Sequence, residues 1–187
     1  MRRVAQVAAV GVVCALLALL VWNVVHTSGG GVANKVNKEQ IVAAPGWERP
    51  RVDTDGKMTL ASLRGKVAVI NFWQSYCAPC TEEAPTLAQS AKNWRNRGVV
   101  FVGIDVQDLR NPALAFIKRF KIDYPIVSDS GPLVGRYGVT GYPETFFVNR
   151  HGCVVPPHYV GPVTHADLNK GIQAAIAERN TRCGTET

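Results

Sequence analysis

Two cysteines separated by two residues follow closely behind a strongly apolar segment, and this junction constrains the fold more than any other feature. The segment is Val67–Trp73, and the cysteines are Cys77 and Cys80. Its β-branched composition is typical of a buried strand. A helix that begins at Cys77 would place this residue where unpaired N–H groups and the helix dipole favour an anion. Because the thiolate is the nucleophilic form of cysteine, the junction predicts a redox pair in which Cys77 attacks and Cys80 resolves.

A zinc site is the alternative for cysteines with this spacing. Closed structural zinc sites need four ligands. The other cysteines, Cys14, Cys153 and Cys183, stand singly, and the four histidines show no metal-ligand spacing. We therefore expect no metal and no cofactor.

The N-terminal residues form a long uncharged segment. Residues 4–25 contain no charged side chain, and Arg2 and Arg3 precede them. A helix needs about 20 residues to cross a bilayer, and the arginines predict a cytoplasmic N-terminus. We therefore expect residues 1–25 to be a single-pass transmembrane anchor, with the rest of the chain outside the cytoplasm. A cleaved signal peptide is the alternative.

The remaining sequence divides into a tether, a domain and a tail. Residues 26–47 are small and polar, which predicts a flexible tether. In residues 48–180, strands alternate with helices, which predicts an α/β fold with a mixed central sheet flanked by helices. The turn signal Asp55-Gly56 predicts an N-terminal β-hairpin within residues 51–60. Residues 181–187 form the expected tail. The other expected strands are 67–73, 99–104, 124–127, 145–148 and 153–160, and the expected helices are 78–95, 111–120, 132–137 and 164–178.

The net charge of +7 does not indicate a nucleic-acid partner. Residues 48–178 contain 15 basic and 12 acidic side chains, so most of the excess lies near the two ends. No basic stripe with interleaved aromatic residues is present, and a nucleic-acid binder would need one.

Several motifs, taken in order, resemble a known family. The segment Asn71–Cys80 is similar to the active site of thioredoxin-like proteins, with Leu63–Lys66 before it and Gly141–Phe146 after it. Together with the N-terminal segment, these motifs resemble the membrane-anchored thiol–disulfide oxidoreductases of the ResA, TlpA and CcmG (DsbE) family. The resemblance covers about residues 48–178 and implies a thioredoxin-like fold with a Cys77–Cys80 redox disulfide.

The resemblance also implies a substrate-binding loop. In this family the bond before the matching proline, here Pro143, is cis and packs against the active-site disulfide. That turn would present the backbone of Tyr142 beside Cys77, where an extended substrate could pair as an added strand. Trp73 is the other residue that we expect to contact substrate.

A further implication concerns the proton acceptor. Asn71 stands where thioredoxin has a buried carboxylate, and an asparagine cannot take a proton. Acidic residues elsewhere serve in ResA-like proteins, and Glu83 and Asp108 match them. Glu83 lies one helical turn after Cys80, so we expect a half-buried carboxyl with a raised pKa; a solvated helix position is the alternative. Asp105 is an equally placed acidic neighbour of Asp108.

Cys153 and Cys183 are left over from the active-site motif. Outside the cytoplasm such cysteines tend to pair, which makes a structural disulfide between them one prediction and two free cysteines the alternative.

The expected activity is reduction of protein disulfides outside the cytoplasm. The resemblance implies substrates such as the haem-attachment cysteines of apocytochrome c, and a membrane electron donor of the DsbD/CcdA type. An oxidase that donates disulfides to secreted proteins is the main alternative, since sequence does not report redox direction. A Sco-like copper metallochaperone would need three residues between the cysteines and a suitably placed histidine. The P-x-x-x-T-x-x-C pattern of peroxiredoxins is absent.

Overall fold

The computed structural model describes residues 2–27, 31–178 and 180–183. The chain divides into two units at Gly30, and the first of these contains helix α1 (Arg2–Thr27). Among the residues that the structure describes, no helix is both long and apolar enough to cross a membrane. The transmembrane anchor expected at residues 1–25 is therefore not confirmed.

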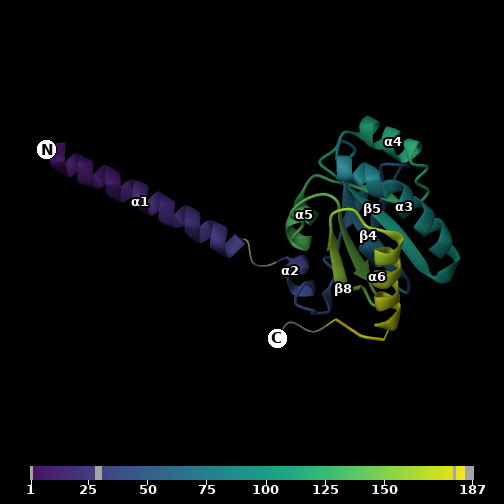
Figure 1. The fold of residues 1–187 in the computed structure, drawn as a ribbon. Helices are drawn as coiled ribbons and strands as arrows, with labels where there is room; N and C mark the ends of the chain where they lie inside the picture. The colour runs from purple at the N-terminus through teal and green to yellow at the C-terminus, as the bar shows by residue number, and fades with distance from the viewer. Residues whose placement is uncertain (1, 28–30, 179, 184–187) are drawn as a thin grey trace. The chain divides into compact units, whose positions relative to one another are not determined.

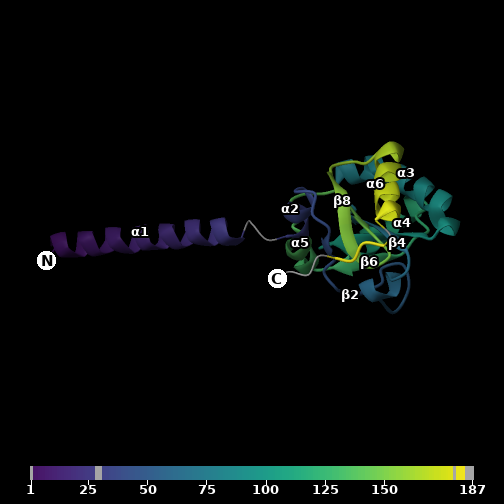
Figure 2. The same ribbon diagram turned by 90° about the horizontal axis from the view of Figure 1, so that it is seen from below.

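The second unit is built around a six-stranded mixed sheet (Figures 1 and 2). The strand order is β1-β8-β7-β4-β5-β6. The central strand β4 pairs parallel with β5 and antiparallel with β7, as a thioredoxin-like fold requires. The strands are β1 (Val42–Ala43), β4 (Val67–Trp73), β5 (Val99–Val106), β6 (Ile126–Asp129), β7 (Glu144–Val148) and β8 (Cys153–Val160).

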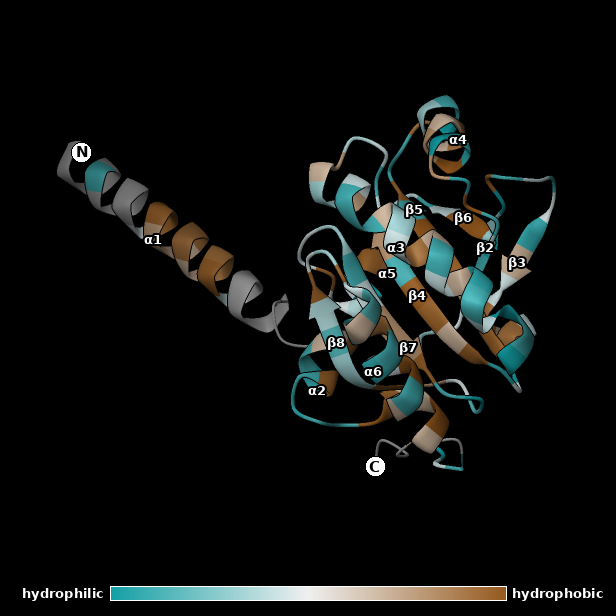
Figure 3. Cartoon of the chain, turned by 45° about the vertical axis from the view of Figure 1, so that its right-hand side comes forward, coloured by the Kyte–Doolittle hydropathy of each residue, from teal (hydrophilic) through white to brown (hydrophobic). Residues whose placement is uncertain are grey.

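Helices cover both faces of this sheet. One core cluster joins α3 (Ala78–Trp94), α4 (Arg110–Arg119) and α6 (His165–Ala177), and a second joins α2 (Val32–Val36) and α5 (Pro132–Tyr137). Alternate residues of β4 point into the two clusters, and all seven are buried. Because both faces are covered, the strand is apolar except at Asn71. Figure 3 shows hydrophobic residues along β4. Two short 3-10 helices, η1 (Leu60–Leu63) and η2 (Arg95–Arg97), complete the unit.

The flexible tether expected at residues 26–47 is wrong from Gly31 onward. Val32 and Val36 of α2 are buried in the core, and β1 pairs antiparallel with the start of β8. The physical reason is a short apolar stripe at helical spacing, which the small and polar composition of the segment conceals. Residues 28–30 lie outside the described part of the chain.

The two short strands near the start of the domain are β2 (Glu48–Pro50) and β3 (Lys57–Thr59). They pair antiparallel in a separate two-stranded sheet, and residues 51–56 connect them. This loop is longer than the two-residue turn expected at Asp55-Gly56, so the first strand lies before Arg51 and not after it.

The C-terminal segment is tied to the sheet. A disulfide joins Cys153 at the start of β8 to Cys183, 30 residues later. Beside it, the side-chain amide of Asn149 donates hydrogen bonds of 2.9 Å to the carbonyl oxygens of Glu178 and Thr181. The tail expected from residue 181 is thus anchored as far as Cys183, and residues 184–187 lie outside the described chain.

Replacing both Cys153 and Cys183 by serine should lower the free energy of unfolding. Opening a loop of this length restores conformational entropy to the unfolded chain worth about 3–4 kcal/mol. Urea unfolding under oxidising conditions measures the difference, and Cys14→Ser in α1 is the matched control. A double variant as stable as that control would show that the disulfide does not stabilise the fold.

Candidate active site

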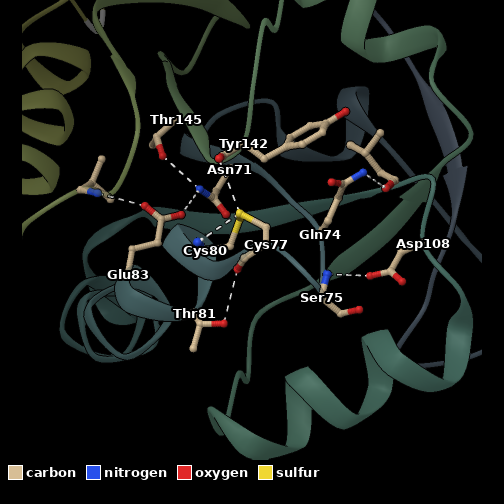
Figure 4. Close-up of a disulfide and its surroundings, with 12 residues drawn as sticks. Asn71, Gln74, Ser75, Cys77, Cys80, Thr81, Glu83, Asp108, Tyr142 and Thr145 are labelled. Atoms are coloured by element: carbon tan, nitrogen blue, oxygen red, sulfur yellow. Dashed lines mark hydrogen bonds between the residues drawn. A yellow bond between two sulfur atoms is a disulfide. The ribbon is translucent and has the colours of Figure 1, made fainter.

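The two cysteines of the sequence motif form a disulfide at the start of α3 (Figure 4). Cys77 is the N-cap residue, and its Sγ accepts a hydrogen bond of 3.2 Å from the N–H of Cys80. Cys77 is partly exposed, whereas Cys80 is only 1% exposed. The local dipole of the helix therefore acts on the sulfur that solvent can reach.

Two hydrogen bonds hold the segment that leads from β4 to Cys77. The N–H of Ser75 donates to Asp108 Oδ2 at 2.6 Å, and the side-chain amide of Gln74 donates to the carbonyl oxygen of Val106 at 3.0 Å. Both partners lie at the end of β5 or just after it, so the neighbouring parallel strand fixes where the helix begins.

The loop before β7 faces the disulfide. The peptide bond between Tyr142 and Pro143 is cis, as the resemblance implied. The carbonyl oxygen of Tyr142 lies 3.5 Å from Cys77 Sγ (Figure 4). This contact brings the backbone of the loop beside the exposed sulfur.

Glu83 lies in α3 three residues after Cys80 and is buried, with 2% of its surface exposed. Its Oε1 accepts a hydrogen bond of 2.7 Å from the side-chain amide of Asn71, and its Oε2 accepts one of 3.0 Å from the N–H of Val163. Burial raises the pKa of Glu83 to about 7, although these two hydrogen bonds act in the opposite direction. The carboxyl is more deeply buried than the half-buried position expected from sequence.

Asn71 connects Glu83 to the central sheet. Asn71 in β4 bonds to Glu83 in α3, and its amide also donates to the hydroxyl of Thr145 in β7 at 3.1 Å. A small cavity beside them is lined by Cys80, Glu83, Asn71 and Trp73, among others. Glu83 and Cys80 thus line the same cavity.

Two acidic residues, Asp105 near the end of β5 and Asp108 just after the strand, have different surroundings. Asp108 accepts hydrogen bonds from the N–H groups of Ser75 and Leu109, so it shapes the loop. Asp105 is the buried member, with one carboxyl oxygen lacking a hydrogen-bond partner. Burial, followed by the charge of Asp108 and a hydrogen bond to it, raises the pKa of Asp105 to about 8. From the sequence, nothing but its position beside Asp108 distinguishes Asp105.

Trp73 does not lie on the surface where a substrate contact would require it. Its side chain is buried, and its ring stacks on Phe116 of α4 with centroids 4.4 Å apart. The exposed aromatic residue next to the disulfide is Tyr76, which is 68% exposed. Trp73 is therefore part of the core, and its burial gives no support to the substrate contact expected of it.

The ranges covered by the structure contain no group of three or more histidine, cysteine or acidic residues that could hold a metal ion. The chemistry that the site can carry is thiol–disulfide exchange, with one exposed sulfur, one buried sulfur and a buried carboxyl beside the latter.

Comparison with known proteins agrees with this geometry. The sequence profile of the AhpC/TSA family matches residues 42–156, which is more than half of the chain. The chain belongs to the AhpC/TSA family.

Curated relatives carry names from thiol–disulfide chemistry. The thiol-disulfide oxidoreductase ResA of Bacillus subtilis is 34% identical over 105 residues, which cover 55% of this chain and 59% of ResA. The thiol:disulfide interchange protein DsbE of Pseudomonas fluorescens is 37% identical over 121 residues, which cover 64% of this chain and 65% of DsbE. The chain thus spans less than two thirds of the length of either relative.

Solved structures show the same fold. A thioredoxin family thiol:disulfide interchange protein from Chlorobium tepidum matches with a TM-score of 0.65 and 31% identity, over 73% of this chain and 97% of that one. A secreted Mycobacterium tuberculosis disulfide oxidoreductase matches with a TM-score of 0.58 and 27% identity, over 68% and 95%.

Glu83→Gln should change how the stability of the oxidised protein depends on pH. A carboxyl whose pKa rises from 4.5 in the unfolded chain to about 7 in the native state binds its proton more tightly when folded. Native stability therefore falls as the pH rises from about 4.5 to about 7, by an amount on the order of 3 kcal/mol. The variant should lack this decrease. Urea unfolding at several pH values measures it, and identical pH profiles would contradict the assignment of the raised pKa to Glu83.

Proposed function

We propose that this protein is an extracytoplasmic thiol–disulfide oxidoreductase that reduces protein disulfides. The observation that carries the proposal is the pairing of an exposed and a buried sulfur at the start of α3 with the buried carboxyl of Glu83. The names of the ResA and DsbE relatives support the same chemistry.

The reaction begins from the reduced pair. The thiolate of Cys77 attacks one sulfur of a substrate disulfide, which forms a mixed disulfide and releases the other substrate sulfur as a thiolate. The sulfur of Cys80, once deprotonated, attacks Cys77 Sγ and releases the second substrate sulfur as a thiolate, and both substrate thiolates then take up protons from water. Two electrons have then passed to the substrate, and the Cys77–Cys80 disulfide remains.

Glu83 serves as the proton acceptor for Cys80 in this scheme. A general base works best when its pKa lies near the operating pH, and the pKa of Glu83 is raised to about 7 by burial. Asp108 acts only through the loop, because its carboxylate already accepts the N–H groups of Ser75 and Leu109. We therefore assign Glu83 to proton transfer and Asp108 to positioning.

The substrate is a protein segment that lies along the backbone of Tyr142 and Pro143. Large exposed apolar side chains stand on three segments around Cys77: Tyr76 beside it, Leu109 next to the Asp108 anchor, and Val160 paired with the residue after Pro143. Such a rim favours a peptide over a small polar thiol. Apocytochrome c with its paired haem-attachment cysteines is the substrate that we propose, and a DsbD/CcdA-type membrane protein is the proposed electron donor.

An oxidase that donates disulfides uses the same site in the opposite direction. It would need a strongly stabilised thiolate. The N-terminus of α3 stabilises an anion at Cys77, whereas a carboxylate at Glu83 opposes a second negative charge close by. The carboxyl of Glu83 therefore favours a protein that reduces disulfides over one that donates them.

We also propose that residues 1–25 anchor the protein in the membrane. Helix α1 covers residues 2–25 of this segment, and its large apolar side chains from Val12 to Trp22 are exposed. Alkaline carbonate extraction tests this: the protein should remain in the membrane pellet, and a shortened soluble form would instead indicate a cleaved signal peptide.

Cys80→Ser should trap a mixed disulfide between Cys77 and a substrate protein, because the second thiol that resolves it is missing. Cys77→Ser should trap little, since Cys80 is buried and cannot reach a protein disulfide. Non-reducing gels of cells that express each variant measure the trapped species, with the double serine variant as the control. Equal trapping by the two single variants would show that the roles of the cysteines are wrongly assigned.

A further inference from the structure

Glu144 and His158 form a buried ionisable pair next to the loop that faces Cys77. Glu144 begins β7 directly after Pro143, and its side chain is completely buried. Its Oε2 lies 2.8 Å from Nε2 of His158 in β8, whose side chain is 2% exposed. Neither residue takes part in the proton transfer proposed for Glu83.

The other oxygen of Glu144 organises the loop. Oε1 accepts hydrogen bonds from the N–H of Thr140 at 2.7 Å, from its hydroxyl at 2.9 Å and from the N–H of Gly141 at 3.1 Å. The next residue is Tyr142, whose carbonyl oxygen lies 3.5 Å from Cys77 Sγ. One carboxylate therefore holds the backbone that a substrate would meet.

The charge state of Glu144 follows from these contacts. Burial would raise the pKa of Glu144, but the hydrogen bonds from His158 and Thr140 outweigh burial and lower it. An ionised carboxylate accepts from all of these donors at once, which a neutral carboxylic acid cannot do as well. The loop thus depends on donors that keep Glu144 in this form.

His158 is itself held in place by its surroundings. The ring stacks on Phe146 with centroids 4.3 Å apart. Its Nδ1 lies 3.1 Å from Oδ1 of Asn37, the C-cap residue of α2. Val36, just before Asn37, is buried in the same core cluster as Phe146. The histidine therefore connects the docked N-terminal segment, residues 31–43, to the active-site loop.

We propose that His158 is a positioning residue for the substrate loop, and that Asn37 couples its orientation to the docking of residues 31–43. The proposal rests on the proposed function, in which the backbone of Tyr142 receives a protein substrate. Residues 31–43 are then a part of the substrate site and not a spacer ahead of the domain.

The variants are chosen so that the fold survives. Removing every polar atom from position 158 would leave a buried carboxylate without its partner and destabilise the domain. His158→Gln retains a donor for Glu144 but loses the planar ring that also meets Asn37. Asn37→Ala removes only the contact between Asn37 and Nδ1 of His158. Gln40→Ala is the matched control, because Gln40 is exposed in the same segment.

The experiment uses the full chain in detergent and two probes: a peptide with one internal disulfide, and dithionitrobenzoic acid as a small disulfide. The ratio of the two reduction rates measures how well the loop at Tyr142 is positioned. Only the peptide binds to the backbone of this loop, whereas the small disulfide does not. Each variant loses about one hydrogen bond that positions the loop. The rate of peptide reduction relative to that of the small disulfide should therefore fall about fivefold in His158→Gln and about twofold in Asn37→Ala. Gln40→Ala should match wild type.

A second readout does not depend on activity. In the oxidised protein, the NMR signals of the Thr140 and Gly141 amides should shift in both variants, because both N–H groups bond to Glu144. Unchanged ratios and unchanged amide signals would overturn the proposal. If wild type reduces neither probe while the amide signals still shift, the proposed function fails and the positioning role stands.

Discussion

The hydrogen bonds of the Glu83 carboxyl are the interaction on which the site depends. They join three elements, because Glu83 lies in α3, Asn71 in β4 and Val163 just before α6. A buried carboxyl is costly unless its oxygens find donors, and here each oxygen has one. The same contacts that make the group tolerable in the core also fix it next to the buried sulfur of Cys80.

Cys77 and Cys80 carry the same thiol group, but their different surroundings give the two sulfurs different reactivity. Cys77 caps α3, where the helix N-terminus favours its thiolate and solvent can reach it. Cys80 lies in the core beside a carboxyl, so its thiol ionises only when a proton can be passed on. The loop at Tyr142 completes the arrangement by placing a backbone carbonyl against the exposed sulfur.

Local sequence signals predicted much of this structure. The strand Val67–Trp73 is apolar apart from Asn71 because both faces of the sheet are covered, and the cysteine spacing marked the start of α3. Contacts between distant segments were not predictable from such signals. The docking of Val32–Val36 depends on a partner surface on the sheet, and the pairing of Glu144 with His158 depends on the register of two strands.

The reduction potential of the Cys77–Cys80 couple in wild type and Glu83→Gln tests the central claim most directly. A carboxylate near the thiols disfavours their ionised form, so wild type should have a potential near that of thioredoxin, about −270 mV. Above pH 7, where Glu83 is ionised, Glu83→Gln should be the more oxidising protein, because its thiolate no longer meets a second negative charge. Equal potentials for the two proteins, or a wild-type value near the −120 mV or so of DsbA, would contradict the account.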